Sequence, residues 1–356
     1  MRVIACRSAY GQGGLGQHFA QLVEESRMQN ELAAYYSHTI KPGDEQVGRL
    51  IDYIKLKKLK RYTPLRFYPS WSGYIGENIF DKKVAKELDV KADAFMGFVG
   101  KSLHSFAQAK KLGYKKLELI AANSHVRNVQ RLHDKAARDL GMKDTWLNEA
   151  LIRKTIKEYE RADFIYTHSE YTRQSLINEG ISPDKLKKTH LKVDDKFIPP
   201  HDKPNDGIFR VVYAGRVDTT KGIPLLIEAF SHLSIKKAQL TLVGGWSSSR
   251  MKQTMMAWMA KDNRIKMAPG DPLIPFQEAD VYVHPTYEDG FAYAPMEALA
   301  CGVPVIVTED TGMKEHVIDG DNGYVIPTGS WQAIHERMEH LIKAPLAKTS
   351  SMVASE

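Results

Sequence analysis

Cysteine is scarce in this sequence. Cys6 and Cys301 are the only two among 356 residues, and they lie far apart, without the spacing of a metal site. Such a pair gives no disulfide framework, and few cysteines suit a reducing compartment. The first residues, MRVIACRSAYGQGG, hold too short an apolar stretch for a signal peptide. We therefore expect a cytoplasmic protein that has no metal site.

Long apolar runs are absent as well. No stretch approaches the roughly 20 residues that span a bilayer, so we expect no transmembrane helix. The net charge is +7, which suits nucleic acid, an acidic membrane surface or a phosphorylated small molecule. The densest basic run, KLKKLKRY at residues 55–62, spreads its lysines around a helix, so membrane contact and a solvated helix both stay open. Aromatic residues do not alternate with the basic runs, so we do not expect nucleic-acid binding.

The chain is longer than a single hydrophobic core usually organises, which favours two domains. β-rich runs alternate with helical patterns, one of which has a cap signal at Ser247, as in parallel sheets with right-handed crossovers. The predicted strands and first helix cover residues 2–7, 13–28, 32–38, 209–215, 238–245, 279–285 and 304–310. We predict an α/β protein of two doubly wound, Rossmann-like domains, at residues 1–195 and 208–356, with a linker at residues 196–207.

Two glycine motifs are similar to nucleotide-binding sequences. Gly11-x-Gly13-x-x-Gly16 has the spacing of a dinucleotide fingerprint, but the second strand ends in Ser37 and lacks the acidic residue that holds a ribose. The loop either approaches an anion or sugar at a helix N-terminus or is a tight turn. Gly100-Lys101-Ser102 looks like the end of a P-loop, but Phe95 stands where the first glycine belongs, and we reject that reading.

The run YAGRVDTTKG places two cations, Arg216 and Lys221, in a loop between a strand and a helix. Anions bind at the carboxyl ends of parallel strands, next to helix N-termini. Arginine makes forked bonds to phosphate oxygens, and lysine supplies a point charge. The pair therefore predicts a diphosphate site that needs no metal, whereas either residue alone would suit a solvated surface.

The run YEDGFAYAPMEALACGVP places Asp289 in a loop after a strand. We expect Pro295 to begin the next helix, which puts Glu297 in its first turn. The backbone N–H groups of residues 290–292, namely Gly290, Phe291 and Ala292, would face the ring of a polyhydroxylated ligand. Two carboxylates also suit a glycosidase, but that reading leaves the two cations unexplained.

Together, YAGRVDTTKG and EDGFAYAPMEALACGVPVIVTEDTGMKEHVIDGDNGYVIP resemble the retaining GT-B glycosyltransferases of family 4. The similarity covers most of residues 208–328, and GGLGQH at residues 13–18 resembles the glycine-rich loop of that family. It implies a GT-B fold with a central cleft, a nucleoside-diphosphate sugar as donor substrate, and no metal or other cofactor. This chain has Asp289 where the family has glutamate, and Lys192 where the family has glycine.

The resemblance also implies roles for individual residues. Arg216 and Lys221 would neutralise the leaving diphosphate, Asp289 would lie near the donor sugar, and Glu297 would bind the ribose. The first domain would contribute His125 near the donor sugar. The glycines on the phosphate and acceptor side would be Gly13, Gly14 and Gly16.

We therefore expect a hexosyltransferase that moves a sugar, with retention, to a hydroxyl of a glycan, a lipid-linked molecule or a small molecule. It would serve polysaccharide or glycolipid synthesis, at the inner face of a membrane if the acceptor is a lipid. Two alternatives stay open. One is an NAD-dependent oxidoreductase that uses the glycines at residues 11–16, and the other is a non-catalytic subunit that binds a sugar nucleotide.

Overall fold

The computed structural model describes residues 1–52, 62–142 and 145–346. Of the basic run at residues 55–62, all but Tyr62 lies outside the described residues. The chain divides into two compact units. The first comprises Met1–Gln130 and Thr145–Lys192, and the second comprises Arg131–Asp144 and Val193–Glu356. No helix in the described ranges is long and apolar enough to cross a bilayer.

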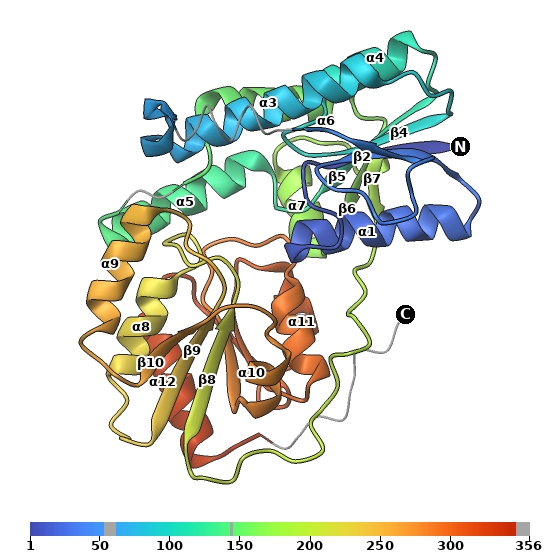
Figure 1. The fold of residues 1–356 in the computed structure, drawn as a ribbon. Helices are drawn as coiled ribbons and strands as arrows, with labels where there is room; N and C mark the ends of the chain where they lie inside the picture. Colours follow the sequence, from blue (N-terminus) through green and yellow to red (C-terminus); the bar gives the residue numbers. More distant parts are fainter. Residues whose placement is uncertain (53–61, 143–144, 347–356) are drawn as a thin grey trace. The chain divides into compact units, whose positions relative to one another are not determined.

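The first unit is built on a parallel sheet, in which the described residues form seven strands in the order β3-β2-β1-β4-β5-β6-β7 (Figure 1). The strands are β1 (Arg2–Ala5), β2 (Leu32–Ser37), β3 (Gly48–Leu50), β4 (Ala94–Phe98), β5 (Lys116–Ala121), β6 (Phe164–Thr167) and β7 (Leu186–Lys188). The helices are α1 (Gly13–Met28), α3 (Pro69–Glu87), α4 (Leu103–Lys111), α5 (Val126–Leu140), α6 (Glu149–Arg161) and α7 (Glu170–Asn178). From Arg131 onward, α5 belongs to the second unit.

Both faces of this first sheet are covered by helices, which explains why its central strand, β4, is apolar throughout. Successive side chains of a strand point to opposite faces. Val3 packs in the cluster formed with α3, α4 and α6, whereas Ile4 packs with Phe19 and Val23 of α1. In Figure 1, α3, α4 and α6 lie on one side of the sheet, and α1 and α7 lie on the other.

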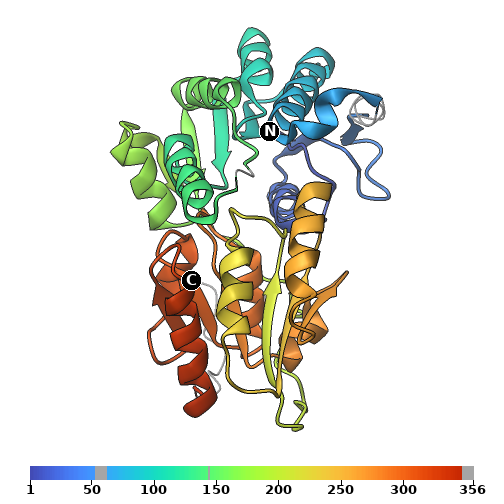
Figure 2. The same ribbon diagram turned by 90° about the vertical axis from the view of Figure 1, so that its left-hand side faces the viewer.

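The second unit has its own parallel sheet, in which the described residues form six strands in the order β10-β9-β8-β11-β12-β13. The strands are β8 (Phe209–Ala214), β9 (Ala238–Val243), β10 (Ile265–Ala268), β11 (Val281–His284), β12 (Val305–Thr308) and β13 (Gly323–Ile326). The helices are α8 (Ile223–Ser231), α9 (Ser249–Met259), α10 (Leu273–Glu278), α11 (Tyr293–Ala300) and α12 (Trp331–Lys343). Figure 2 shows α8, α9 and α12 in front of the strands, and Figure 1 shows α10 and α11 on the opposite face.

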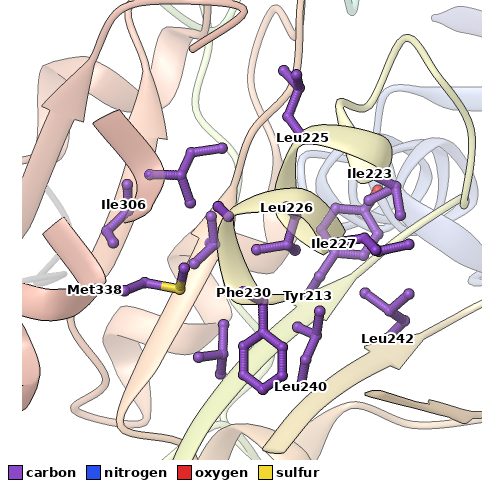
Figure 3. Packing of buried hydrophobic residues seen from close by; sticks show 14 of the residues in the cluster. Tyr213, Ile223, Leu225, Leu226, Ile227, Phe230, Leu240, Leu242, Ile306 and Met338 are labelled. Carbon is purple, nitrogen blue, oxygen red and sulfur yellow. The ribbon is translucent and has the colours of Figure 1, made fainter. Parts of the chain in front are cut away.

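Helix α8 is the centre of the hydrophobic core of the second unit (Figure 3). Ile223, Leu226 and Phe230 recur at the spacing of one helix face and are completely buried. They pack in one cluster with Leu240 of β9 and Met338 of α12. Burying a side chain of this size contributes about 1.5–3 kcal/mol. This core fixes the start of α8, and therefore the end of the loop that precedes it.

The predicted strands and the helix over residues 13–28 are confirmed, and so is the fold class of two doubly wound α/β domains. Two details are wrong. Helix α11 begins at Tyr293 rather than at Pro295, so Glu297 lies beyond the first turn. Proline is tolerated at the third helical position because its missing N–H would have no partner within the helix there. The hydroxyl that caps α9 belongs to Ser248 and not to Ser247.

Each sheet reverses its strand order once, between β1 and β4 in the first unit and between β8 and β11 in the second. At such a reversal the loops after the two strands diverge and leave a crevice, in which ligands of open α/β sheets bind. The loops that follow β8 and β11 are those that carry YAGRVDTTKG and YEDGFAYA. The topology therefore brings two motifs that are distant in sequence to one edge of the second sheet.

Candidate functional site

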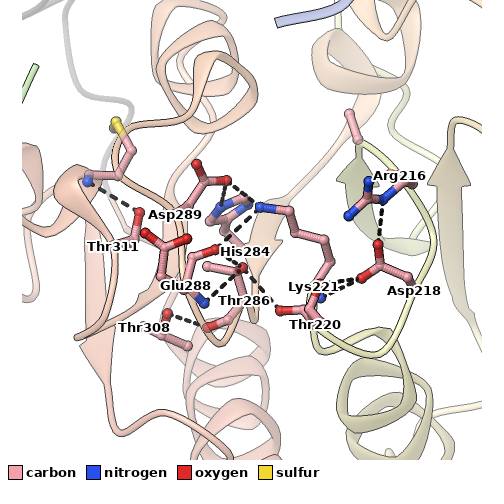
Figure 4. A network of polar contacts seen from close by, with 12 residues as sticks. Arg216, Asp218, Thr220, Lys221, His284, Thr286, Glu288, Asp289, Thr308 and Thr311 are labelled. Carbon is pink, nitrogen blue, oxygen red and sulfur yellow. Dashed lines mark hydrogen bonds and ion pairs between the residues drawn. The ribbon is translucent and has the colours of Figure 1, made fainter. Parts of the chain in front are cut away.

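The loop after β8 is folded around the carboxylate of Asp218, whose side chain is buried (Figure 4). Asp218 accepts a hydrogen bond from the Thr220 hydroxyl at 2.8 Å and one from the Lys221 backbone N–H at 2.8 Å. Its second oxygen accepts from Nε of Arg216 at 2.5 Å. The Arg216 side chain remains 47% exposed. Asp218 thus orients the Arg216 guanidinium and leaves much of it accessible to a ligand.

The same loop is joined closely to the loop after β11. The Tyr287 N–H donates to the Thr220 carbonyl at 2.8 Å. Gly222 precedes α8 with a φ of +67°, and a Cβ atom at this position would lie 1.8 Å from the Pro285 carbonyl oxygen. Only glycine allows both the left-handed backbone and this approach. Backbone contacts alone therefore fix the positions of the two motifs relative to each other.

Lys221 and Asp289 form the ion pair that crosses this junction (Figure 4). The Lys221 Nζ lies 2.6 Å from Oδ2 of Asp289, and it also donates to the Glu288 carbonyl at 3.3 Å. Burial acts to raise the pKa of Asp289, but Lys221 and His284 outweigh it and lower that pKa to about 2. Asp289 is therefore fully ionised at neutral pH. The structure brings the carboxylate of Asp289 to the lysine, whereas Glu288 contributes its backbone carbonyl.

His284, the last residue of β11, lies directly behind the ion pair. Its Nδ1 is 3.0 Å from the Tyr282 hydroxyl, and its Nε2 is 3.4 Å from Oδ2 of Asp289. Burial lowers the pKa of His284, although Asp289 opposes that change. His284 is therefore neutral and supports Asp289 as a dipole.

The loop that joins Asp289 to α11 is pinned to the loop after β12. The Asp289 N–H donates to the Asp310 carbonyl at 3.2 Å, and the Gly312 N–H donates to the Asp289 carbonyl at 3.0 Å. Of the next three residues, Gly290 and Ala292 are buried and Phe291 is half-buried, with its ring 5.3 Å from that of His316. Their predicted contacts with a sugar ring stay a prediction.

Glu297 lies in α11, buried, and its carboxylate makes no hydrogen bond with the residues that the structure describes. Burial raises its pKa to about 7, against the opposing charge of Lys196. At neutral pH this group exists both as the acid and as the carboxylate. Either form can bond to a ligand hydroxyl, which agrees with the predicted contact to a ribose without testing it.

The other predicted residues belong to the first unit. Gly13 begins α1 with a φ of +65°, and Gly14 beside it is exposed. Gly16 is buried, and a Cβ atom there would lie 2.2 Å from the Ala9 carbonyl oxygen, so this glycine is required for packing. The Nδ1 of His125 accepts a hydrogen bond from the Arg127 N–H at 3.2 Å at the start of α5. The predicted roles of the glycines on the phosphate and acceptor side, and of His125 near the donor sugar, stay predictions.

Three residues of the site were not predicted from the sequence. Asp218 stands inside YAGRVDTTKG, and its place two residues after an arginine was the available signal. His284 ends a strand that was predicted correctly. His133 of α5 belongs to the second unit and is buried, which lowers its pKa to about 3 although Asp218 acts in the opposite direction. Nothing in the sequence around His133 indicates this position.

Residues 194–354 match the family described as Glycosyl transferases group 1. The capsular polysaccharide biosynthesis glycosyltransferase CapM of Staphylococcus aureus is 29% identical over 170 residues, 46% of this chain and 44% of CapM. The putative colanic acid biosynthesis glycosyltransferase WcaL of Salmonella typhimurium is 25% identical over 51% of this chain and 48% of WcaL. The chain thus aligns with less than half the length of these curated relatives.

Solved structures match over nearly the whole chain. Sucrose-phosphate synthase from Thermosynechococcus elongatus has a TM-score of 0.74 at 19% identity, covering 97% of this chain and 90% of that chain. Anabaena HepE in complex with UDP-glucose has a TM-score of 0.66 at 16% identity, covering 96% and 89%. WaaG, a glycosyltransferase involved in lipopolysaccharide biosynthesis, has a TM-score of 0.67 at 16% identity, covering 96% and 90%. The chain therefore has the two-domain GT-B fold, and its residues 194–354 match the group 1 glycosyl transferases.

Proposed function

We propose that the chain is a retaining glycosyltransferase of family 4, which moves a hexosyl group from a nucleoside-diphosphate sugar to an acceptor hydroxyl. One observation carries the proposal. Two cations, Arg216 held by Asp218 and Lys221 held by Asp289, lie at the strand reversal between β8 and β11, inside the part of the chain that matches the group 1 family.

The leaving diphosphate is the group that these cations would bind. As the bond from the anomeric carbon to the diphosphate oxygen breaks, negative charge grows on that oxygen. Arg216 already has its orientation fixed by Asp218, and the Lys221 side chain is only 19% exposed, so neither needs large rearrangement. Preorganised cations of this kind stabilise the transition state more than the ground state. This supports a transfer that needs no metal.

Retention is proposed from the resemblance to family 4. The acceptor oxygen would bond to the anomeric carbon on the face that the diphosphate leaves. The acceptor proton would pass to an oxygen of the leaving phosphate, so that no side chain has to act as nucleophile. Asp289 is fully ionised but paired with Lys221, which suits a group that positions the lysine and contacts sugar hydroxyls.

The relatives support the choice of donor and acceptor class. HepE was solved with UDP-glucose, and CapM and WcaL are named for polysaccharide synthesis. We propose a sugar nucleotide as donor and a glycan or lipid-linked acceptor, used in the cytoplasm at the inner membrane face. Contact with that surface would involve the basic run at residues 55–62.

Calorimetric titration with UDP, GDP, ADP and NAD, in the absence of divalent metal, tests this function. We expect one nucleoside diphosphate to bind, and Lys221→Met to weaken that binding at least tenfold, since a charge-assisted contact is lost. The exposed Lys261→Met in the same unit is the matched control and should change affinity less than twofold. NAD binding that is indifferent to Lys221 would instead favour an oxidoreductase. Binding without turnover of any UDP-, GDP- or ADP-sugar would favour a non-catalytic subunit.

A further inference from the structure

The first unit has a charged cluster at its own strand reversal, and the proposed donor site does not use it. Arg7 follows β1 and Lys101 follows β4, the two strands between which the order of the sheet reverses. Glu77 of α3 lies between them. Lys101 belongs to the Gly-Lys-Ser run that does not fit a P-loop. Its place at the carboxyl end of a central strand gives that lysine another use.

The contacts within this cluster do not use the hydrogen-bonding capacity of the Lys101 ammonium group. The Arg7 guanidinium donates to Oε1 of Glu77 at 3.0 Å. The Lys101 Nζ lies 3.8 Å from Oε2 of the same carboxylate, beyond hydrogen-bond length. Within residues 1–52, 62–142 and 145–346, no hydrogen bond reaches that Nζ, although Lys101 is 9% exposed. Nε of Arg7 and Oε2 of Glu77 are likewise buried without a hydrogen bond.

The charges of the cluster do not balance. Two cations share one carboxylate, and two ionisable groups beside them, His38 and Cys6, add no negative charge. Burial lowers the pKa of His38, so that its ring is neutral, and burial raises the pKa of the Cys6 thiol to about 12, so that it stays protonated. A nearly buried ammonium is costly unless an anion and hydrogen bonds compensate it. The position therefore favours an anionic ligand.

Helix α1 strengthens this preference. The loop after β1 leads into α1, so the N-terminus of this helix lies at the same edge of the sheet as Arg7. Gly13 and Gly14 are exposed there, and the first N–H groups of a helix have no partner within it. Together with the helix dipole, such groups favour a phosphate or carboxylate.

We infer that Arg7 and Lys101 bind a phosphate group carried by the acceptor, either a soluble sugar phosphate or the phosphate of a lipid headgroup. Arginine would grip two phosphate oxygens and lysine would supply a point charge, while Glu77 holds both cations in place before the ligand arrives. That the ligand is the acceptor rests on the proposed function. The phosphate site itself does not, because it stands on contacts within the first unit.

The test is calorimetric titration of the full chain with glucose 6-phosphate, in a Lys221→Met background that removes a cation of the other unit. Binding should persist in this background. Adding Lys101→Met should weaken it about tenfold or more, and Lys101→Arg should restore most of it. The control is Lys115→Met, whose side chain is 77% exposed and pairs only with Asp93 in the described structure, and it should change affinity less than twofold.

A second arm identifies the source of the phosphate. The same variants are sedimented with phosphatidylcholine vesicles that contain phosphatidylglycerol. Dependence on Lys101 in the vesicle arm alone assigns the lipid headgroup, and dependence in the glucose 6-phosphate arm assigns the soluble ligand. If neither arm depends on Lys101 beyond the Lys115→Met control, the inference is wrong. Should Lys101→Met fail to fold by circular dichroism, Arg7→Gln replaces it with the same expected loss.

The two proposals fail separately. Loss of all nucleotide binding would overturn the donor site of the second unit and leave the phosphate titration unaffected. Nucleotide binding that depends on Lys221, together with phosphate binding that is indifferent to both Arg7 and Lys101, would keep the transferase and remove the phosphorylated acceptor.

Discussion

The two strand reversals of this molecule carry charged residues in different balance. In the second unit each cation has its own carboxylate, Asp218 for Arg216 and Asp289 for Lys221. In the first unit, Arg7 and Lys101 share Glu77. The fold supplies the same topological position twice, but the side chains make one position neutral and fully paired and leave the other positive.

The difference affects how firmly each cation is positioned before a ligand binds. A paired cation is held in place and loses little conformational entropy on binding, but its carboxylate competes with an anionic ligand. An under-compensated cation attracts an anion more strongly but is less stable without one.

The backbone of the two strand-to-helix turns gives the sharpest contrast. Gly222→Ala would force a Cβ atom against the Pro285 carbonyl oxygen in a left-handed conformation, and we expect a loss of about 4 kcal/mol or failure to fold. Gly13→Ala has a similar φ but no atom within 4 Å of the added Cβ, and should cost about 1 kcal/mol. Urea unfolding of both variants measures the difference. Equal losses would mean that the close approach at Gly222 is unimportant.

Substitutions in the Lys221–Asp289 ion pair should affect stability and nucleotide binding differently. Lys221→Met leaves Asp289 charged and without its lysine, although its side chain is only 16% exposed, and we expect a loss of about 3 kcal/mol of unfolding free energy. The double variant Lys221→Met/Asp289→Asn should recover most of that stability in thermal unfolding but none of the nucleotide affinity. Recovery of affinity in the double variant would contradict the assignment of Lys221 to the diphosphate.

Glu297 provides a pH-dependent contrast with the fully ionised Asp289. Its pKa is raised to about 7 in the folded chain, from an ordinary value of 4.5. Between these values the folded state holds more protons than the unfolded state, so the free energy of unfolding falls as pH rises. Glu297→Gln should remove a slope worth about 2 kcal/mol over this range. Burial also raises the pKa of Glu158 to about 7, so the wild-type minus variant difference is the quantity to measure.

We expect the smallest effect from a substitution of Glu77, the carboxylate that Arg7 and Lys101 share in the first unit. Glu77→Gln removes the anion that competes for Arg7 and Lys101, and we expect glucose 6-phosphate to bind about threefold more tightly. Titration at two ionic strengths checks that the gain is electrostatic, since salt should reduce it. Weaker binding would show that Glu77 orients the two cations more than it competes for them.

Much of this architecture could be predicted from local patterns. Runs such as FRVVYAG and AQLTLVGG are mostly apolar and end in glycine, which is typical of buried parallel strands. The start of α11 could not be located, because proline fits any position of the first turn and so does not mark its first residue. Serines at positions 247–249 made the cap of α9 equally ambiguous.

The sequence by itself determined the two α/β units and the cations Arg216 and Lys221, because hydrophobic periodicity and glycine spacing are local properties. Only the tertiary structure decided the partners. It paired Lys221 with Asp289, distant in sequence, because β8 and β11 are neighbours in the sheet. It likewise set Lys101 beside Arg7 and Glu77, because β4 lies next to β1. Charge balance at a site depends on which strands are adjacent, and strand order is a non-local property of the fold.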